Sequence, residues 1–184
     1  MKKPSLKTRL FLLTIVVVAV LVGYFLYRNK KAPAGPTPLP TSQQSAWREV
    51  VPGVSTKEDV AQKLGKPKVE GESSLEFQSN SPTRNHALSF EEGVVSLIKE
   101  VVSFRDATNV SSLTSKYGEA SGILYGPDAE NGYYLFVYAE KGVAYLGNPA
   151  TENLLEIWYF PVTSFEDFQE RWATSYSESL SPRF

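Results

Sequence analysis

Side chains that could do chemistry are scarce in this sequence. Among its 184 residues there is one histidine, His86, and no cysteine, which excludes thiol catalysis and cysteine-ligated metal sites. His86 opens an apolar, strand-like run, and a lone histidine in such a place is more often structural than catalytic. No serine lies in a nucleophile motif, and no glycine-rich phosphate loop is found. The sequence therefore predicts no catalytic residue and no cofactor.

Carboxylates remain as possible metal ligands or acid–base groups. Asp128 and Glu130 lie at a glycine-flanked turn, but their spacing is not that of a calcium-binding loop, so we expect no metal site. Glu91, Glu92 and Glu140 fall at predicted hairpin turns, where acidic side chains are usually solvated. An enzyme that uses them would need a polar pocket that gathers several of them and raises their pKa values.

Aromatic residues form the strongest candidate site. Tyr134, Phe136 and Tyr138 alternate along one strand-like run, which places them on the same face of a sheet. Tyr and Trp are favoured anchors of protein interfaces, so an open face of this kind would bind another protein. The alternative is an ordinary core, with the last helix covering the other face. The predicted partner-binding residues are Tyr134, Phe136, Tyr138, Tyr145 and Trp158.

The elements that would position this face begin with a helix and a hairpin. Ser55 and Glu58 have the spacing of a capping box, and Gly65 supplies a signal that ends the helix. Strand-like runs follow at residues 75–77 and 86–98, and the second turns back at a Glu-Glu-Gly sequence. The pattern predicts a short helix followed by antiparallel strands.

The same order returns in the second half of the chain. Asn109 precedes a helix that Gly118 ends, and a strand, a charged turn and another strand follow. The helix-ending glycines, Gly65 and Gly118, lie 53 residues apart, and the turn glycines, Gly93 and Gly142, lie 49 apart. This spacing favours an internal duplication. Chance is the alternative, because a helix followed by a hairpin is common.

A strand over residues 154–160 and a last helix complete the predicted domain. Thr163 and Glu166 have capping-box spacing at the start of that helix. Its aromatic residues share one face: Phe165, Phe168 and Trp172. The prediction is an α+β domain over residues 47–176, made of two helix-plus-antiparallel-hairpin repeats and a C-terminal helix, with a flexible tail at 177–184.

One segment resembles a known family. Residues 52–67 form a proline-glycine-led, capped helix that ends in Leu-Gly-Lys-Pro, and a Phe-Glu-Glu-Gly-Val hairpin follows at 90–94. This pattern resembles the SmpA/OmlA (BamE-like) family of small envelope proteins, and its doubling is similar in layout to the beta-lactamase inhibitor protein. The resemblance implies a non-enzymatic, protein-binding envelope module. The outer-membrane members are lipid-anchored through a cysteine, which this sequence lacks.

The N-terminal segment predicts a membrane anchor. Residues 10–27 carry no charge, and as a helix they would span about 27 Å, close to the thickness of a bilayer core. Basic residues flank this run, with 1–9 expected in the cytoplasm and 28–46 forming a proline-rich linker. The prediction is a single-pass, uncleaved signal anchor in the cell membrane with an extracytoplasmic C-terminal domain. A cleaved signal peptide is the alternative.

Charge narrows the choice of partner. From Glu49 onward the chain carries eleven basic and twenty acidic residues, a formal charge of −9, which argues against nucleic acid. The predicted function is that of a membrane-anchored, non-enzymatic module that binds another protein, in envelope assembly or as an inhibitor-like protein. The alternatives are an envelope or cell-wall enzyme accessory that uses surface carboxylates, and a structural subunit of an envelope or secretion complex.

Overall fold

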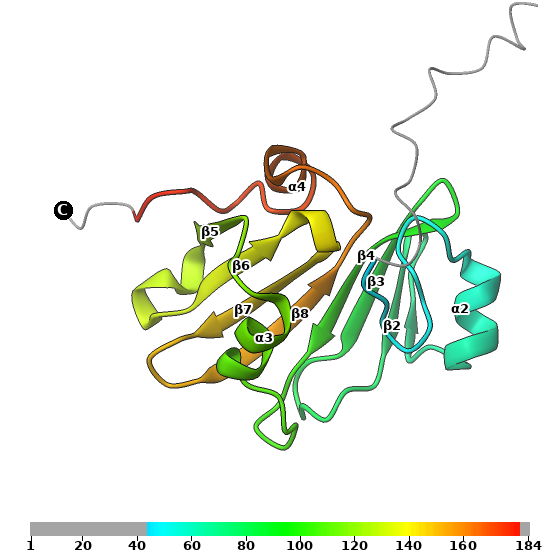
Figure 1. The fold of residues 1–184 in the computed structure, drawn as a ribbon. Helices are drawn as coiled ribbons and strands as arrows, with labels where there is room; N and C mark the ends of the chain where they lie inside the picture. The colour runs from blue at the N-terminus through cyan, green and yellow to red at the C-terminus, as the bar shows by residue number, and fades with distance from the viewer. Residues whose placement is uncertain (1–43, 181–184) are drawn as a thin grey trace, which may run out of the picture. The chain divides into compact units, whose positions relative to one another are not determined.

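The computed structural model describes residues 44–180, in which one antiparallel sheet carries three short α-helices (Figure 1). The helices are α2 (Lys57–Leu64), α3 (Val110–Tyr117) and α4 (Phe165–Trp172). Two 3-10 helices are η1 (Pro127–Asn131) and η2 (Ala139–Lys141). The strands are β1 (Val69–Glu70), β2 (Ser74–Phe77), β3 (His86–Glu91), β4 (Val94–Val101), β5 (Gly122–Tyr125), β6 (Tyr134–Tyr138), β7 (Val143–Asn148) and β8 (Asn153–Tyr159).

The eight strands lie in the order β1-β2-β3-β4-β8-β7-β6-β5. On each side of the sheet, neighbouring strands are consecutive in the chain. At the centre of the sheet β4 pairs with β8, and these two strands are distant in sequence. Their register places Ile98 opposite Tyr159 and Lys99 opposite Trp158. In Figure 1 the green strands β3 and β4 accordingly adjoin the orange strand β8. The β4–β8 ladder joins both halves of the chain into one sheet.

Each face of the sheet has its own hydrophobic core. On one face, α2 and α3 pack against a cluster that includes Leu88, Ile98 and Tyr145. On the other face, Phe168 of α4 packs into a second cluster with Trp158. Because side chains alternate along a strand, β6 and β7 contribute residues to both cores. These strands are therefore covered on both faces.

Each α-helix follows a residue whose side chain caps it. Asn109 caps α3 as the sequence predicts, but α2 begins after Thr56 and α4 after Ser164. The predicted caps at Ser55 and Thr163 are one residue too early. The hydroxyl of Ser55 is buried and accepts a hydrogen bond from the backbone N–H of Val51 at 3.0 Å, so it cannot cap the helix.

The predicted fold class, α+β with two helix-plus-antiparallel-hairpin repeats, is wrong. The described residues form a mostly β structure, with one eight-stranded sheet and three helices of eight residues each. Local patterns indicate hairpins, but the pairing of β4 with β8 depends on contacts between residues about 60 positions apart. No local periodicity encodes that pairing.

The predicted transmembrane helix is not supported either. Within residues 44–180 no helix has the length and apolar character needed to cross a bilayer. An eight-residue helix extends about 12 Å, less than half of a bilayer core. The predicted span 10–27 and the basic segment 1–9 lie outside the described residues. The absence of a membrane-spanning helix in residues 44–180 stands against the predicted single-pass anchor and against the cell-membrane location that depended on it.

Two buried tyrosine hydroxyls hold α3 on the sheet. The hydroxyl of Tyr138 donates to the backbone oxygen of Gly118 at 3.1 Å, at the C-terminal end of the helix. The hydroxyl of Tyr145 lies 2.8 Å from Oγ1 of Thr114, in the middle of α3. Burial raises the pKa of the Tyr138 phenol above its ordinary value, so this phenol stays protonated and can act as a donor.

The first turn of α3 is held by the β7–β8 turn. Glu152, at a positive φ of 61°, accepts a hydrogen bond on its carboxylate from the N–H of Ser111 at 2.7 Å. A carboxylate at this position also interacts favourably with the helix dipole. At the other end, Lys141 donates to the backbone oxygen of Tyr117. The helix is thus attached at its start, middle and end.

Replacing Tyr145 with phenylalanine should lower the free energy of unfolding by about 1 kcal/mol, because it removes the hydrogen bond to Thr114 and the longer, 3.4 Å contact with the hydroxyl of Tyr138 without leaving a cavity. Tyr134→Phe is the matched control, since the Tyr134 hydroxyl makes no hydrogen bond to a described residue; its effect should stay within about 0.5 kcal/mol. Urea denaturation measures both. Equal effects of the two substitutions would show that the Tyr145 hydroxyl does not hold α3.

Candidate functional site

The predicted aromatic surface is divided between the two cores. Tyr145, Tyr138 and Trp158 are buried, with 0%, 3% and 2% of their surface exposed. Tyr134 and Phe136 are half-buried, and Phe136 stacks on Tyr145 with ring centroids 4.9 Å apart. Three of these five side chains could reach a partner only if the core opened. Contact of another protein with this set stays a prediction.

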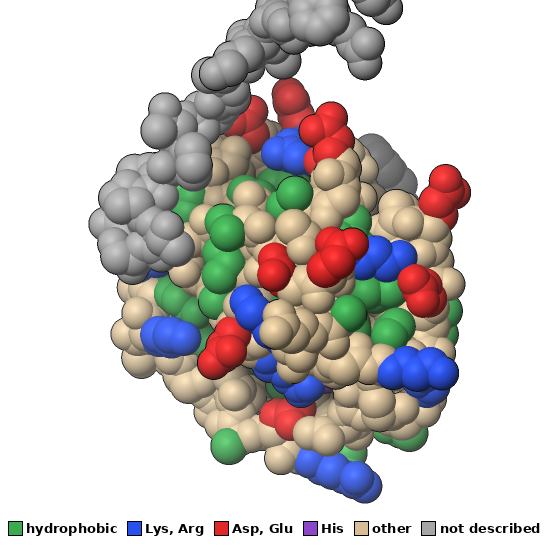
Figure 2. Space-filling view, turned by 90° about the vertical axis from the view of Figure 1, so that its right-hand side faces the viewer, with side chains coloured by type: hydrophobic (Ala, Val, Ile, Leu, Met, Phe, Trp, Pro, Cys, Tyr) green, Lys and Arg blue, Asp and Glu red, His purple; other side chains and the backbone are tan. Residues whose placement is uncertain are grey.

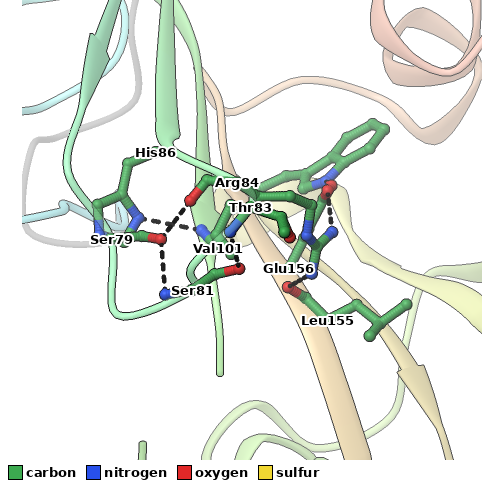
Figure 3. A network of polar contacts seen from close by, with 9 residues as sticks. Ser79, Ser81, Thr83, Arg84, His86, Val101, Leu155 and Glu156 are labelled. Atoms are coloured by element: carbon green, nitrogen blue, oxygen red, sulfur yellow. Dashed lines mark hydrogen bonds and ion pairs between the residues drawn. The ribbon is translucent and has the colours of Figure 1, made fainter. Parts of the chain in front are cut away.

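Trp158 is held by charged neighbours. Its indole N–H donates to Glu156 at 2.7 Å, and the ammonium of Lys99 lies 3.8 Å from its ring centroid. Burial lowers the pKa of Lys99. Glu156 also accepts from Arg84 at 3.1 Å, as Figure 3 shows. These contacts attach the β2–β3 loop to β8, so this cluster has a structural role.

A polar cleft lies elsewhere, on the face of the sheet that carries α3. Its volume is about 580 Å³, within the usual range of ligand sites. We call it the α3 cleft. It is bounded by the 47–50 turn, the β2–β3 loop, the ends of β3, β4 and β8, the 102–108 loop and α3. Its lining residues are Arg48, Gln78, Ser79, Asn80, His86, Glu100, Val101, Val102, Arg105, Asp106, Ala107, Thr108, Leu113, Lys116, Tyr117, Ile157 and Tyr159.

The wall formed by the β2–β3 loop is fixed by short side chains. The hydroxyl of Ser79 donates to the backbone oxygen of Arg84 and accepts from the N–H of Ser81 at 3.0 Å. Figure 3 shows this loop together with His86, whose Nδ1 accepts a hydrogen bond from the N–H of Val101 at 3.0 Å. The hydrogen bonds of Ser79 therefore hold the loop together internally, and the hydrogen bond of His86 joins the first residue of β3 to the last residue of β4.

Arg48 reaches the cleft from a strained turn. Trp47 and Val50 are buried and pair through two backbone hydrogen bonds, which leaves Arg48 and Glu49 at the centre of a two-residue turn with φ angles of 48° and 68°. Such a turn favours Asn and Gly, and the left-handed conformation costs other residues about 1–2 kcal/mol each. The guanidinium of Arg48 lies 4.6 Å from the centroid of the Trp47 ring.

Arg105 and Phe104 lie at the tip of a hydrogen-bonded turn. The carboxylate of Asp106 accepts from the N–H of Ser103 at 2.7 Å, and the hydroxyl of Ser103 accepts from the N–H of Arg105 at 3.1 Å. The backbone N–H of Ser103 is also the main cause that lowers the pKa of Asp106. Phe104 is 91% exposed at this tip. It borders a second hollow of about 470 Å³ on the far side of the same loop.

The acidic and basic groups of the cleft differ in their partners. Glu100 accepts from the hydroxyl of Tyr159 at 2.8 Å, and Asp106 accepts from Ser103 and from Asn80. The cleft's basic side chains pair with no acidic group among the described residues: Arg48, Arg105 and Lys116. On the side shown in Figure 2, acidic and basic side chains are interspersed over the surface. The α3 cleft therefore presents unpaired positive charge.

His86 lies against the wall of this cleft. It is 4% exposed and packs on Trp47 with ring centroids 5.0 Å apart. Burial, with a further contribution from the positive charge of Arg48, lowers the pKa of His86, while Glu100 and Asp106 oppose that shift. Because its Nδ1 is already a hydrogen-bond acceptor, the neutral ring carries its proton on Nε2.

The carboxylates considered for an enzyme do not meet in this cleft. Glu91 pairs with Arg171 of α4 at 2.6 Å, and Glu92 lies beside it in the β3–β4 turn. Glu140 belongs to η2, in the connection between β6 and β7. Among residues 44–180 there is no group of three side chains that could hold a metal ion.

Sequence reasoning missed the residues that shape the α3 cleft. Arg48, Arg105 and Lys116 come from three separate elements, and no motif links them. The sequence held a partial signal at residues 103–106. A serine three residues before an aspartate is typical of a tight turn, and Phe104 lies between these two residues. The strained turn at Arg48 has no such signal, because its two central residues are Arg and Glu.

Comparisons with known proteins return little. No protein-family model matches the chain, and no curated protein matches it. Among solved structures, the chain is similar to a DUF4309 family protein (YjgB) from Bacillus subtilis, with 15% sequence identity, a TM-score of 0.47, and coverage of 65% of this chain and 88% of that one.

The resemblance to the SmpA/OmlA family and to the beta-lactamase inhibitor protein is therefore wrong. No family model matches the chain, and the described residues form one eight-stranded sheet in place of the two helix-plus-hairpin repeats on which the resemblance depended. The physical reason lies in the size of the motif. Residues 52–67 encode a helix that is capped by Thr56 and ended by Gly65, and such caps occur in many unrelated folds.

Acidification should destabilise the protein through His86. Below its ordinary pKa, near 6.5, the unfolded chain takes up a proton at this residue while the folded chain, whose His86 pKa is lowered, does not. The free energy of unfolding should therefore fall between pH 7 and pH 5. In the variant His86→Asn, an amide oxygen can accept from Val101 without titrating, and the fall should be smaller.

Urea denaturation at several pH values measures this difference, and NMR titration of the His86 ring provides an independent check. The NMR titration should give a midpoint below 6.5 in the folded protein. A midpoint above 6.5, or a wild type that loses no more stability than His86→Asn, would contradict the burial of a neutral histidine.

Proposed function

We propose that the described domain is a non-enzymatic module that binds another protein through the 103–106 turn and the adjoining α3 cleft. The observation that carries this proposal is Phe104, a large aromatic side chain with 91% of its surface exposed on a turn that is fixed by internal hydrogen bonds. Aromatic side chains often dominate the binding energy of interfaces. A preformed turn lowers the entropy cost of binding.

The surroundings of Phe104 support a binding role. The guanidinium of Arg105 lies 5.5 Å from its ring centroid, and Arg is also enriched at interfaces. The 102–108 loop lies between the α3 cleft and the second hollow, so a partner that covers Phe104 could fill concave surface on either side. This combination of an exposed anchor and adjoining hollows suits a polypeptide ligand.

The groups that might catalyse a reaction have structural partners instead. His86 uses Nδ1 to accept from the backbone, Glu100 accepts from Tyr159, and Asp106 holds the turn that carries Phe104. The only acceptor nitrogen of the neutral His86 ring is thereby used, and the hydrogen bonds of Glu100 and Asp106 hold these carboxylates to the protein. These contacts favour binding over catalysis as the role of the α3 cleft.

Site-specific photo-cross-linking tests the proposal. A photoreactive phenylalanine analogue at position 104, in cells that produce the protein, should give a defined cross-linked product with one partner protein. The same analogue at Val54 is the matched control and should give none, because Val54 is 56% exposed and lies beside the start of β4, at the opposite end of that strand from the turn. A product of equal yield at both positions, or no product at 104, would contradict the proposed surface.

The variant Phe104→Ala adds a second measurement. Because Phe104 makes little contact with the rest of the domain, its removal should change the free energy of unfolding by less than about 0.5 kcal/mol. Affinity for the captured partner should fall about 30-fold or more, as expected for an aromatic anchor. Unchanged affinity with unchanged stability would show that Phe104 is not the anchor.

A further inference from the structure

We infer that the α3 cleft binds a single carboxylate group of the partner polypeptide, next to an apolar side chain that meets Phe104. This inference rests on the protein-binding function proposed above and specifies its chemistry. The argument uses the charge of the cleft, the strain at Arg48 and the position of the exposed aromatic ring.

The first support is an excess of positive charge. Arg48, Arg105 and Lys116 reach the cleft from a turn, a loop and a helix, and each lies near the aromatic ring of its neighbour in sequence, at 4.6, 5.5 and 4.8 Å from the centroid. These contacts orient the cations without neutralising them. The domain around them carries a formal charge of −9. Acidic side chains are therefore abundant, but none in the described residues forms an ion pair with these three cations.

The second support is the conformation of Arg48. The turn would be more stable with Asn or Gly in its left-handed positions, yet the chain has Arg between the buried residues Trp47 and Val50. Strain of this kind is characteristic of functional positions. Because the turn directs an unpaired guanidinium to the cleft, the function served by Arg48 is recognition of an anion.

The charge balance selects the kind of anion. The cleft has one net positive charge when His86 is neutral, because its three cations exceed its two carboxylates, Glu100 and Asp106, by one. A carboxylate, with one negative charge, balances this excess. A phosphate group near pH 7 carries up to two, and the two acidic groups would repel the second. A bidentate contact with the planar guanidinium of Arg48 also suits a carboxylate.

Phe104 and the negative charge of the domain together determine which residues should flank that carboxylate in the partner polypeptide. An exposed ring beside Arg105 offers apolar contact to the residue adjacent to the acid. A run of several acids would be repelled by the formal charge of −9 on the domain as a whole. The ligand that fits is therefore one Glu or Asp flanked by aliphatic or aromatic residues.

Titration of the isotopically labelled full chain with short blocked peptides tests this chemistry by NMR. The probes are Ala-Leu-Glu-Leu-Ala, the same peptide with glutamine in place of glutamate, and the same peptide with phosphoserine there. The glutamate peptide should shift the signals of the 102–108 loop and the last turn of α3. It should bind about fivefold more tightly than the glutamine peptide, the lower range for a charge-assisted contact at a partly exposed site.

Three variants assign the effect to the cleft. Arg48→Asn and Lys116→Gln should each weaken binding of the glutamate peptide about threefold or more, and Arg48→Asn should leave the domain equally or more stable because Asn suits the turn. Lys66→Gln is the matched control, since Lys66 is exposed and lies outside the cleft. It removes the same charge and should have no comparable effect.

The outcomes separate this inference from the proposed function. Equal affinity for the glutamate and glutamine peptides, or equal effects of Lys116→Gln and Lys66→Gln, would overturn the carboxylate site while leaving the cross-link at position 104 intact. Tighter binding of the phosphoserine peptide would overturn the charge argument in favour of a dianion. Loss of the cross-link at 104 instead overturns the proposed function itself.

Discussion

The attachment of α3 to the sheet is the interaction on which the candidate site depends. Tyr138 and Tyr145 project from β6 and β7, and their hydroxyls contact the end and the middle of the helix. Lys116 lies between these two points of attachment. Without them one wall of the α3 cleft would be absent. The aromatic residues of β6 and β7 therefore position a helix that carries part of the candidate site.

The cleft also shows how an acidic domain can present a local positive surface. Its two acids are engaged by neutral donors, Glu100 by Tyr159 and Asp106 by Ser103 and Asn80, rather than by the nearby cations. Elsewhere in the described residues, ion pairs join elements that must stay together, as Arg171 and Glu91 do. The separation of charges inside the cleft is therefore a feature of its geometry and does not follow from composition.

Local sequence signals predicted local structure and failed where distant segments meet. Asn109 and Gly118 delimit α3 because caps depend on residues three or four positions away. The pairing of β4 with β8, which joins both halves of the chain in one sheet, was not predicted, because no short-range pattern specifies it. The alternation of Tyr134, Phe136 and Tyr138 indicated a shared face but not its burial, which depends on where α3 lies. The positive φ of Arg48 was missed for the same reason, because buried neighbours impose it.

Native-state hydrogen exchange tests the attachment of α3 most directly, because two matched amides report on two helices. The N–H of Gly118 bonds to Thr114 at the end of α3, and the N–H of Gly65 bonds to Ala61 at the end of α2, which has no tyrosine hydroxyl bonded to it. The account predicts that Gly118 exchanges more slowly, since α3 opens only when its contacts with the sheet break. Exchange at Gly118 as fast as at Gly65 would contradict it.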